Sequence, residues 1–417
     1  MTASTTNRNN LRELAKQQAE IAALPIMAKR EALWYDLNDG SSKNPLVIME
    51  FHGDRDEIYP PLTCEDPLLR SVERQLAHNI YSHKHFNDDR VIPGFIKLRV
   101  PNFIVPFNYQ HPELKLAGSP SIGYMYDHAI NNLEADYNVF KPSTFSVDKG
   151  LREANILKQN LENIIGDILP VKLDFPSFTF NPANILISMM SMETMFYSML
   201  DYPELFHKIM RQLTDDYHAY IDALEVGCAI LPNNGSSTVD QDSYGYTHDL
   251  PCAKTLNRPA KLSDVWGYSN FQETVGMSVE MFDEFFFGYM LEISDRCGLY
   301  AYGCCEPVDE LFEPCLSRMK NLRKLSVSPW CNEEALAEMI RGTKICYHRK
   351  PSPNYVSADT VFNEDEYLKH LEKTVIAARG CPLEITFRDI TTVHGEPWRL
   401  GRAVELAREA IARHWQG

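Results

Sequence analysis

The chain has 417 residues, of which 44% are hydrophobic and 24% are charged, a balance typical of a globular protein and not of a disordered or fibrous one. Its 41 basic and 57 acidic residues give a formal net charge of -16. Such a surface repels phosphate backbones and anionic lipids, which disfavours nucleic acid and membranes as partners. The sequence shows neither a membrane-spanning apolar run nor a signal peptide. We therefore expect a cytoplasmic protein.

The first residues show helical spacing, with Leu11, Leu14 and Ile21 among charged residues, and residues 1–44 are therefore expected to form a helical extension. Beyond them, β-type runs alternate with amphipathic helical patterns. The predicted strands are 46–51, 91–100, 168–173, 228–231, 264–268, 299–303, 325–327, 344–347 and 383–387, and the predicted helices are 151–165, 191–200, 203–224, 279–296, 334–341, 364–378 and 397–414.

Strands that alternate with helices predict βαβ units and a parallel sheet. No flexible or low-complexity linker divides residues 45–417, which favours a single (β/α)8 TIM barrel over two doubly wound domains. The stretch from Phe107 to Asp148 is too long for a simple connection, so we expect it to be an inserted lid.

Seven of the ten cysteines lie between Cys297 and Cys381, and Cys304 and Cys305 are adjacent. In a long chain without an export signal, free thiols are expected rather than a disulfide framework. The adjacent pair directly follows a predicted strand and is itself followed by Glu306, which places all three on the catalytic face of a barrel. Thiolates and a carboxylate suit an open zinc site. The alternative is that one cysteine packs in the barrel wall and the other is a loop residue.

Polar side chains also follow other predicted strands. Each alone is more often a solvated loop residue or a helix cap than a functional group, but their recurrence at one face favours a site. These residues are His52, Asp240, Asn270, His348, Arg388 and Asp389, and Trp266 and Tyr268 are candidates for an aromatic pocket wall.

Four segments resemble the uroporphyrinogen decarboxylase superfamily, and within it the corrinoid-dependent methyltransferases that include O-demethylase components. The similarity extends in order over residues 45 to 415. The segments are Leu299-Tyr-Ala-Tyr-Gly-Cys-Cys-Glu-Pro307, Asn321-Leu-Arg-Lys-Leu-Ser-Val-Ser-Pro-Trp330, Asp201-Tyr-Pro-Glu-Leu-Phe-His207 and Leu383-Glu-Ile-Thr-Phe-Arg-Asp389.

The resemblance implies a single (β/α)8 barrel and, in the methyltransferases, zinc held by a His-x-Cys pair and a later cysteine. Here Cys304 matches the first cysteine, but Tyr302 occupies the histidine position. Arg388 and Asp389 follow the last strand, where no cysteine is found. The resemblance therefore gives Cys304, Cys305 and Glu306 as metal ligands, with His348 as a further substitute.

The implied activity is transfer of a methyl group from a small methylated substrate, such as a methoxylated aromatic compound, to the cobalt of a corrinoid carried by a separate protein. Zinc, or a proton from Glu306, Tyr302 or His348, would stabilise the leaving atom, and Asp389 is a further catalytic candidate. His52, Asp240, Trp266, Tyr268, Asn270 and Arg388 are the expected substrate contacts.

Two alternatives and one question of assembly stay open. A decarboxylase of the same superfamily would act on a tetrapyrrole or another small carboxylate, but the matching segment from Ile48 to Arg55 carries one arginine among acidic residues, where the decarboxylases have an arginine-rich segment. A non-catalytic scaffold for a corrinoid protein would need no polar pocket. A homodimer is also left open.

Overall fold

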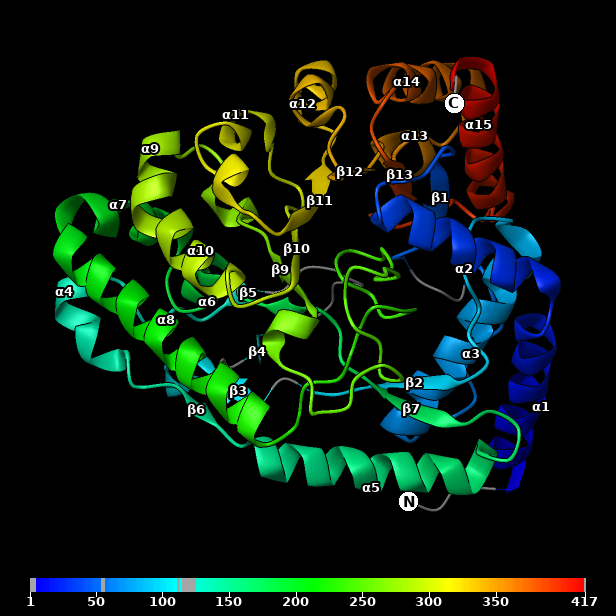
Figure 1. The fold of residues 1–417 in the computed structure, drawn as a ribbon, viewed down its shortest axis with the longest axis horizontal. Helices are drawn as coiled ribbons and strands as arrows, with labels where there is room; N and C mark the ends of the chain where they lie inside the picture. The colour runs from blue at the N-terminus through cyan, green and yellow to red at the C-terminus, as the bar shows by residue number, and fades with distance from the viewer. Residues whose placement is uncertain (1–4, 54–56, 102, 111–112, 115–124, 416–417) are drawn as a thin grey trace.

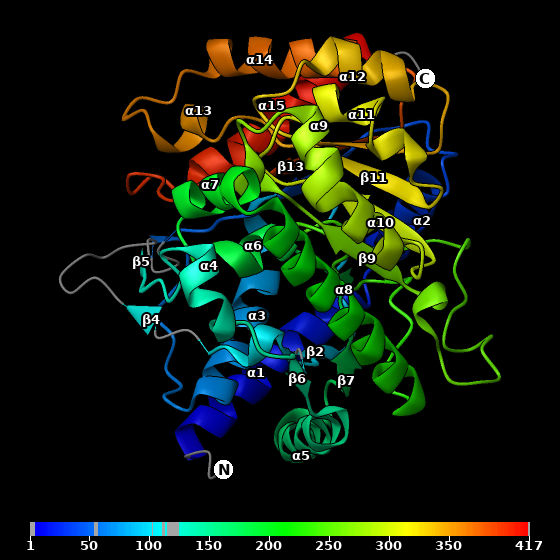
Figure 2. The same cartoon turned by 90° about the vertical axis from the view of Figure 1, so that its left-hand side faces the viewer.

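The computed structural model describes the whole chain except residues 1–4, 54–56, 102, 111–112, 115–124 and 416–417. Arg55 and part of the expected lid lie outside the described residues. Helices occupy the periphery of the molecule, and the strands and a long irregular segment lie inside them (Figure 1). In the view turned by 90°, helices again cover the outside from top to bottom (Figure 2).

The main sheet has seven parallel strands in the order β1-β13-β12-β11-β10-β9-β8, and β2 and β7 form a separate parallel pair. Because β8 begins shortly after β7 ends, the two act as one broken strand that pairs first with β2 and then with β9. The strands are β1 Leu46–Met49, β2 Ile96–Arg99, β7 Val171–Asp174, β8 Phe178–Thr179, β9 Trp266–Ser269, β10 Leu299–Tyr302, β11 Leu322–Val327, β12 Cys346–Arg349 and β13 Leu383–Phe387.

This arrangement is consistent with a (β/α)8 barrel-like fold, but the expected closed barrel is not found among the described residues, because no ladder joins β1 to β2. The free edge of β1 is covered instead by Asp88, Asp89 and Arg90, mainly through their side chains and through one backbone hydrogen bond from the Asp89 amide to the Val47 carbonyl at 2.8 Å. The amides of Val47 and Met49 donate to the carboxylates of Asp89 and Asp88, at 2.8 and 3.0 Å, and Arg90 donates to the Met49 carbonyl at 3.0 Å. Buried backbone groups need partners, so these side chains replace the missing ladder.

The side chains of successive residues in a strand point alternately into two environments. On β13, Leu383, Ile385 and Phe387 belong to the main apolar cluster, whereas Glu384 and Thr386 are buried on the opposite side. We call the first side the outer face, because it packs against the helices, and the second side the inner face. The period-2 pattern follows from strand geometry.

The long helices match the predicted helical patterns closely except for α3, which was not predicted; the short helices α4, α6 and α13 were not predicted either. The start of α3 carries a recognisable signal, because Asp66 caps the helix by accepting from the amides of Leu68 and Leu69 and Pro67 occupies the first turn. The helices are α1 Thr5–Ala22, α2 Pro25–Asn38, α3 Pro67–His85, α4 Leu133–Asp136, α5 Val147–Ile165, α6 Pro182–Ile187, α7 Met192–Asp201, α8 Pro203–Val226, α9 Val279–Phe282, α10 Gly288–Ser294, α11 Asp309–Phe312, α12 Glu333–Ile340, α13 Asn354–Ser357, α14 Glu364–Ala377 and α15 Trp398–His414.

The two N-terminal helices pack against the rest of the fold. In α1, Leu11 and Ala15 join a cluster with residues of α3, α5, β2 and β7, and in α2, Trp34 and Leu37 pack with Ile48 of β1. Helices α1 and α2 thus lie in the region expected to be helical, whereas the division of the chain at residue 45 stays a prediction. None of the described helices is long and apolar enough to cross a membrane.

The described part of the expected lid packs against the body. Leu133 of α4 and Phe140 are buried in the main apolar cluster. Two short antiparallel pairs also lie in or beside this region, namely β3 Ile104–Val105 with β6 Thr144–Phe145 and β4 Glu113–Leu114 with β5 Met125–Tyr126.

The predicted strand at residues 228–231 is wrong, because the chain is irregular there. The side chain of Asn233 gives hydrogen-bond partners to backbone groups that a strand at this position would otherwise pair. It accepts from the Trp266 amide at 2.9 Å and donates to the Pro176 carbonyl at 3.2 Å. We call residues 229–250 the inner loop. The green segment in the centre of Figure 1 contains it.

A buried ion pair ties the inner loop to the sheet. Lys324 Nζ lies 2.9 Å from Glu384 Oε2, and both side chains are fully buried on the inner face. Ser243 of the inner loop donates to the same carboxylate oxygen at 2.7 Å. Burial alone would raise the pKa of Glu384, but the neighbouring His348 and Lys324 hold it below its ordinary value.

Removing the cation of this pair is expected to destabilise the fold strongly. Lys324→Met leaves the Glu384 carboxylate buried without its main partner, so the free energy of unfolding should fall by roughly 3–5 kcal/mol. Lys16→Met is the control, because Lys16 pairs with Glu13 on an exposed helix surface, and its effect should stay within about 0.5 kcal/mol. Urea denaturation of both variants measures the difference. Equal midpoints for the two would contradict the role assigned to the pair.

Candidate functional site

The candidate site lies at the carboxyl ends of β9 to β13, where the chain leaves the sheet. We call this region the mouth and define it by Tyr268, Asn270, Cys304, Cys305, Lys350 and Arg388. Gly303 ends β10 with a φ of 97°, a conformation that glycine adopts without strain. This turn leads directly into the two cysteines.

Glu306 holds the loop after β10 in place. Its Oε1 accepts from the amide of Phe271 at 2.8 Å and its Oε2 from the amide of Cys304 at 2.9 Å. Burial raises the pKa of Glu306 in spite of these hydrogen bonds. Both carboxylate oxygens are thus used by the backbone, which makes Glu306 a positioning residue for the cysteine loop.

The two thiols of Cys304 and Cys305 lie side by side, with their Sγ atoms 3.5 Å apart. Cys305 is exposed and Cys304 is half-buried. The hydrogen bond from Cys304 lowers the pKa of Cys305 to about 7, and the same contact, together with burial, raises the pKa of Cys304. Cys305 is therefore the stronger nucleophile of the pair near neutral pH.

Asp240 of the inner loop and His348 of β12 form the buried centre of the site. His348 Nδ1 lies 2.9 Å from Asp240 Oδ2, and Nε2 lies 2.9 Å from Thr386 Oγ1. Burial alone would raise the pKa of Asp240, but His348 and Lys350 hold it well below its ordinary value. The two ring nitrogens of His348 are thus already engaged, and the second Asp240 oxygen has no hydrogen-bond partner among the described residues.

Gln241, which follows Asp240 in the inner loop, joins two residues of the mouth, Tyr268 and Lys350. The Tyr268 hydroxyl accepts from Gln241 at 3.0 Å and from Asn270 at 3.1 Å, and it donates to the Gly303 carbonyl at 3.3 Å. Lys350 donates to the Gln241 amide oxygen. Burial raises the pKa of Tyr268 well above its ordinary value, so its hydroxyl keeps its proton.

Arg388 and Asp389 end β13 beside His52. Arg388 NH1 lies 3.7 Å from the Asp242 carboxylate and makes no hydrogen bond to the described residues. The amide of Asp389 donates to His52 Nδ1 at 3.2 Å. Burial alone would lower the pKa of Arg388, but Asp242 and Asp389 raise it, so the guanidinium is a permanent positive charge.

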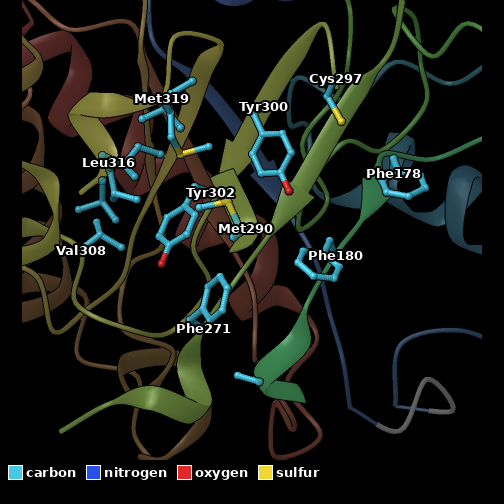
Figure 3. Packing of buried hydrophobic residues seen from close by; sticks show 14 of the residues in the cluster. Phe178, Phe180, Phe271, Met290, Cys297, Tyr300, Tyr302, Val308, Leu316 and Met319 are labelled. Carbon is cyan, nitrogen blue, oxygen red and sulfur yellow. The ribbon is translucent and has the colours of Figure 1, made fainter. Parts of the chain in front are cut away.

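Two of the predicted site residues lie elsewhere. Tyr302 is on the outer face, where its ring stacks on Phe271 with 6.2 Å between centroids and points among Val308, Leu316 and Phe271 (Figure 3). Its hydroxyl is buried and has no hydrogen-bond partner among the described residues. Trp266 is fully buried at the start of β9 and donates to the Gly245 carbonyl at 3.0 Å. Both side chains are packed into the fold rather than presented to a substrate.

The side chains present do not fit the zinc site that the resemblance implies. Glu306 has both oxygens committed to backbone amides, and Tyr302, in the histidine position, points into the apolar layer behind the sheet. Within the described ranges no three His, Cys, Asp or Glu side chains are grouped so that they could hold a metal ion.

The sequence analysis did not predict that the charged residues Lys324, Lys350 and Glu384 are buried. A signal was present for Glu384, which stands between Leu383 and Ile385 in a short strand, whereas Lys324 and Lys350 each directly follow an arginine. Strands of a parallel sheet covered on both faces are ordinarily apolar throughout, so a charge within such a run indicates a polar inner face.

The reactivity of Cys305 provides a direct test of the thiol contact. Because the thiolate is the reactive form, alkylation of Cys305 should accelerate as pH rises and reach half of its maximal rate near pH 7. Cys304→Ala removes the hydrogen-bonding thiol, which should move this midpoint up toward about 8.5, the value of an unperturbed cysteine.

Peptide mass spectrometry after iodoacetamide pulses at a series of pH values gives the rate for each cysteine. The exposed Cys228 is the internal reference, and its profile should be the same in both proteins. An unchanged Cys305 midpoint in Cys304→Ala would show that the neighbouring thiol does not control its ionisation.

Comparison with known proteins adds evidence on the fold. No family model matches the chain, and no curated protein matches its sequence. Among solved structures, a methyltransferase from Methanosarcina mazei is similar over 92% of this chain and 99% of its own, with a TM-score of 0.52 and 12% sequence identity. At this identity the similarity concerns the fold: the chain shares the overall architecture of that methyltransferase over most of its length.

Proposed function

We propose that the protein is a methyltransferase that binds a small methylated substrate at the mouth and passes its methyl group to the cobalt of a corrinoid carried by a partner protein. The observation that carries the proposal is the fold similarity to a methyltransferase over nearly the whole of both chains. The polar mouth at the carboxyl ends of the strands, where barrel-type enzymes bind substrates, supports it.

Three buried polar atoms support binding of a polar substrate there. Arg388 NH1, Asn270 Oδ1 and Asp240 Oδ1 have no hydrogen-bond partner among the described residues. An unpaired buried donor or acceptor costs about 1–3 kcal/mol. A ligand with a matching acceptor and donors would recover part of this cost, which gives these atoms a role in substrate binding.

The chemical task is to stabilise the leaving atom, since a methyl ether is a poor electrophile. Reduced corrinoid cobalt supplies the nucleophile when the partner protein is bound. In this chain Arg388 offers an unused N–H group and a fixed positive charge to the oxygen that gains negative charge, and Lys350 adds a second charge that acts on Cys304. Such donors act mainly on the transition state.

The test is methyl transfer to cobalt. Wild type, incubated with a reduced corrinoid protein and a panel of methoxylated aromatic compounds, should produce the methyl–cobalt spectrum with at least one donor. Arg388→Gln should lower kcat/KM by about 100-fold, the effect of losing one donor to a developing oxyanion. Arg211→Gln is the control, because Arg211 forms an exposed ion pair with Glu292 on the helical surface.

Thermal melting of all three proteins separates catalysis from folding. Equal rates in wild type and Arg388→Gln would remove Arg388 from the mechanism. Release of carbon dioxide from a tetrapyrrole or another small carboxylate, with no methyl–cobalt formed from any donor, would contradict methyl transfer and support decarboxylation by the same fold.

A further inference from the structure

The adjacent thiols at the mouth have an arrangement that methyl transfer does not require. Their Sγ atoms are already in contact at 3.5 Å, and Cys305 is open to solvent. The other eight cysteines differ in exposure: six are buried, Cys252 is half-buried and Cys228 is exposed. Dissolved reagents therefore have a direct route to this pair through Cys305.

We propose that Cys304 and Cys305 are a site of reversible oxidation, at which a peroxide converts the two thiols into a disulfide between adjacent residues. In the first step the Cys305 thiolate attacks one peroxide oxygen, and the O–O bond breaks to give a sulfenic acid and release the other oxygen as hydroxide or alkoxide. In the second step the sulfur of Cys304 attacks the Cys305 sulfur, the S–O bond breaks, and the released hydroxide takes the Cys304 proton as water. Two electrons pass from the thiols to the peroxide.

The geometry predicts that this disulfide is easily reduced. Disulfide-linked residues usually have Cα atoms about 4.4–6.8 Å apart, whereas consecutive Cα atoms across a trans peptide are about 3.8 Å apart. A bond between neighbours is therefore strained, and strained or exposed disulfides have the more oxidising potentials of regulatory or labile bonds. Thiol reductants should restore the pair.

The backbone hydrogen bonds of the loop hold Cys304 in place but leave Cys305 able to move when the disulfide forms. Cys304 is anchored, since its amide donates to Glu306 and its carbonyl accepts from Ser326 Oγ at 2.9 Å. The backbone of Cys305 makes no hydrogen bond within the described part of the chain. Closing the S–S bond therefore moves Cys305 toward a fixed Cys304.

The test uses mass spectrometry of the full chain and does not depend on enzymatic activity. Wild type is treated with stoichiometric hydrogen peroxide, alkylated with iodoacetamide and digested. The fragment that holds both residues should lose the mass of two hydrogen atoms and resist alkylation, and dithiothreitol should restore both. Cys304→Ser and Cys305→Ser should each abolish this loss, whereas the control Cys228→Ser should retain it.

Two results would overturn the proposal. One is addition of oxygen to Cys305 in wild type while Cys304 remains free for alkylation. The other is a peroxide-induced disulfide that joins either residue to a different cysteine. Because wild type alone gives both readouts, the test is decisive even where a serine variant does not fold.

Discussion

The buried charges of the inner face determine how the rest of this structure is arranged. Lys324 and Glu384 are fully buried and 2.9 Å apart, and such a pair is tolerable only when its remaining hydrogen-bonding capacity is also met. Ser243 meets part of that need. The inner loop must therefore lie against the inner face of the sheet, because it supplies this partner. If the inner face were apolar, the side chains of the strands would fill this space themselves.

The position of the inner loop in turn places the polar groups of the mouth. Asp240 precedes Ser243 in the loop and contacts His348, and Gln241 joins Lys350 to Tyr268. Hydrogen bonds join the ion pair to Asp240 through Thr386 and His348. The adjacent Gln241 belongs to a second set, which reaches the loop of the thiols. Networks of this kind are rigid when fully satisfied, so the unpaired atoms of Asp240, Asn270 and Arg388 mark the places where a ligand would add the missing hydrogen bonds.

The outer face and most helices could be predicted from sequence because their signals are local. Leu383, Ile385 and Phe387 read as a strand, and the observed limits of β13 agree with the predicted ones. The inner loop could not be predicted, because residues 228–231 have strand-like composition and only the distant partners of Asn233 show that they are not paired. Cys304, Cys305 and Arg388 follow the ends of their strands, as the sequence indicates, whereas Tyr302 lies on the outer face, which the sequence did not indicate because strand register cannot be read from one short motif.

We call the boundary between β1 and β2, where no ladder joins the two strands, the seam. The seam affects how the sheet opens. Elsewhere a strand separates from its neighbour only when several ladder hydrogen bonds break together. At the seam, the amides of Val47 and Met49 are held by two aspartate side chains, and one backbone hydrogen bond joins the Asp89 amide to the Val47 carbonyl, so fewer bonds must break to expose them. Hydrogen exchange at these two amides would then occur by a local fluctuation with a much lower free energy than global unfolding. The seam also gives β1 an edge that is already occupied by carboxylates, which discourages pairing with a strand of another molecule.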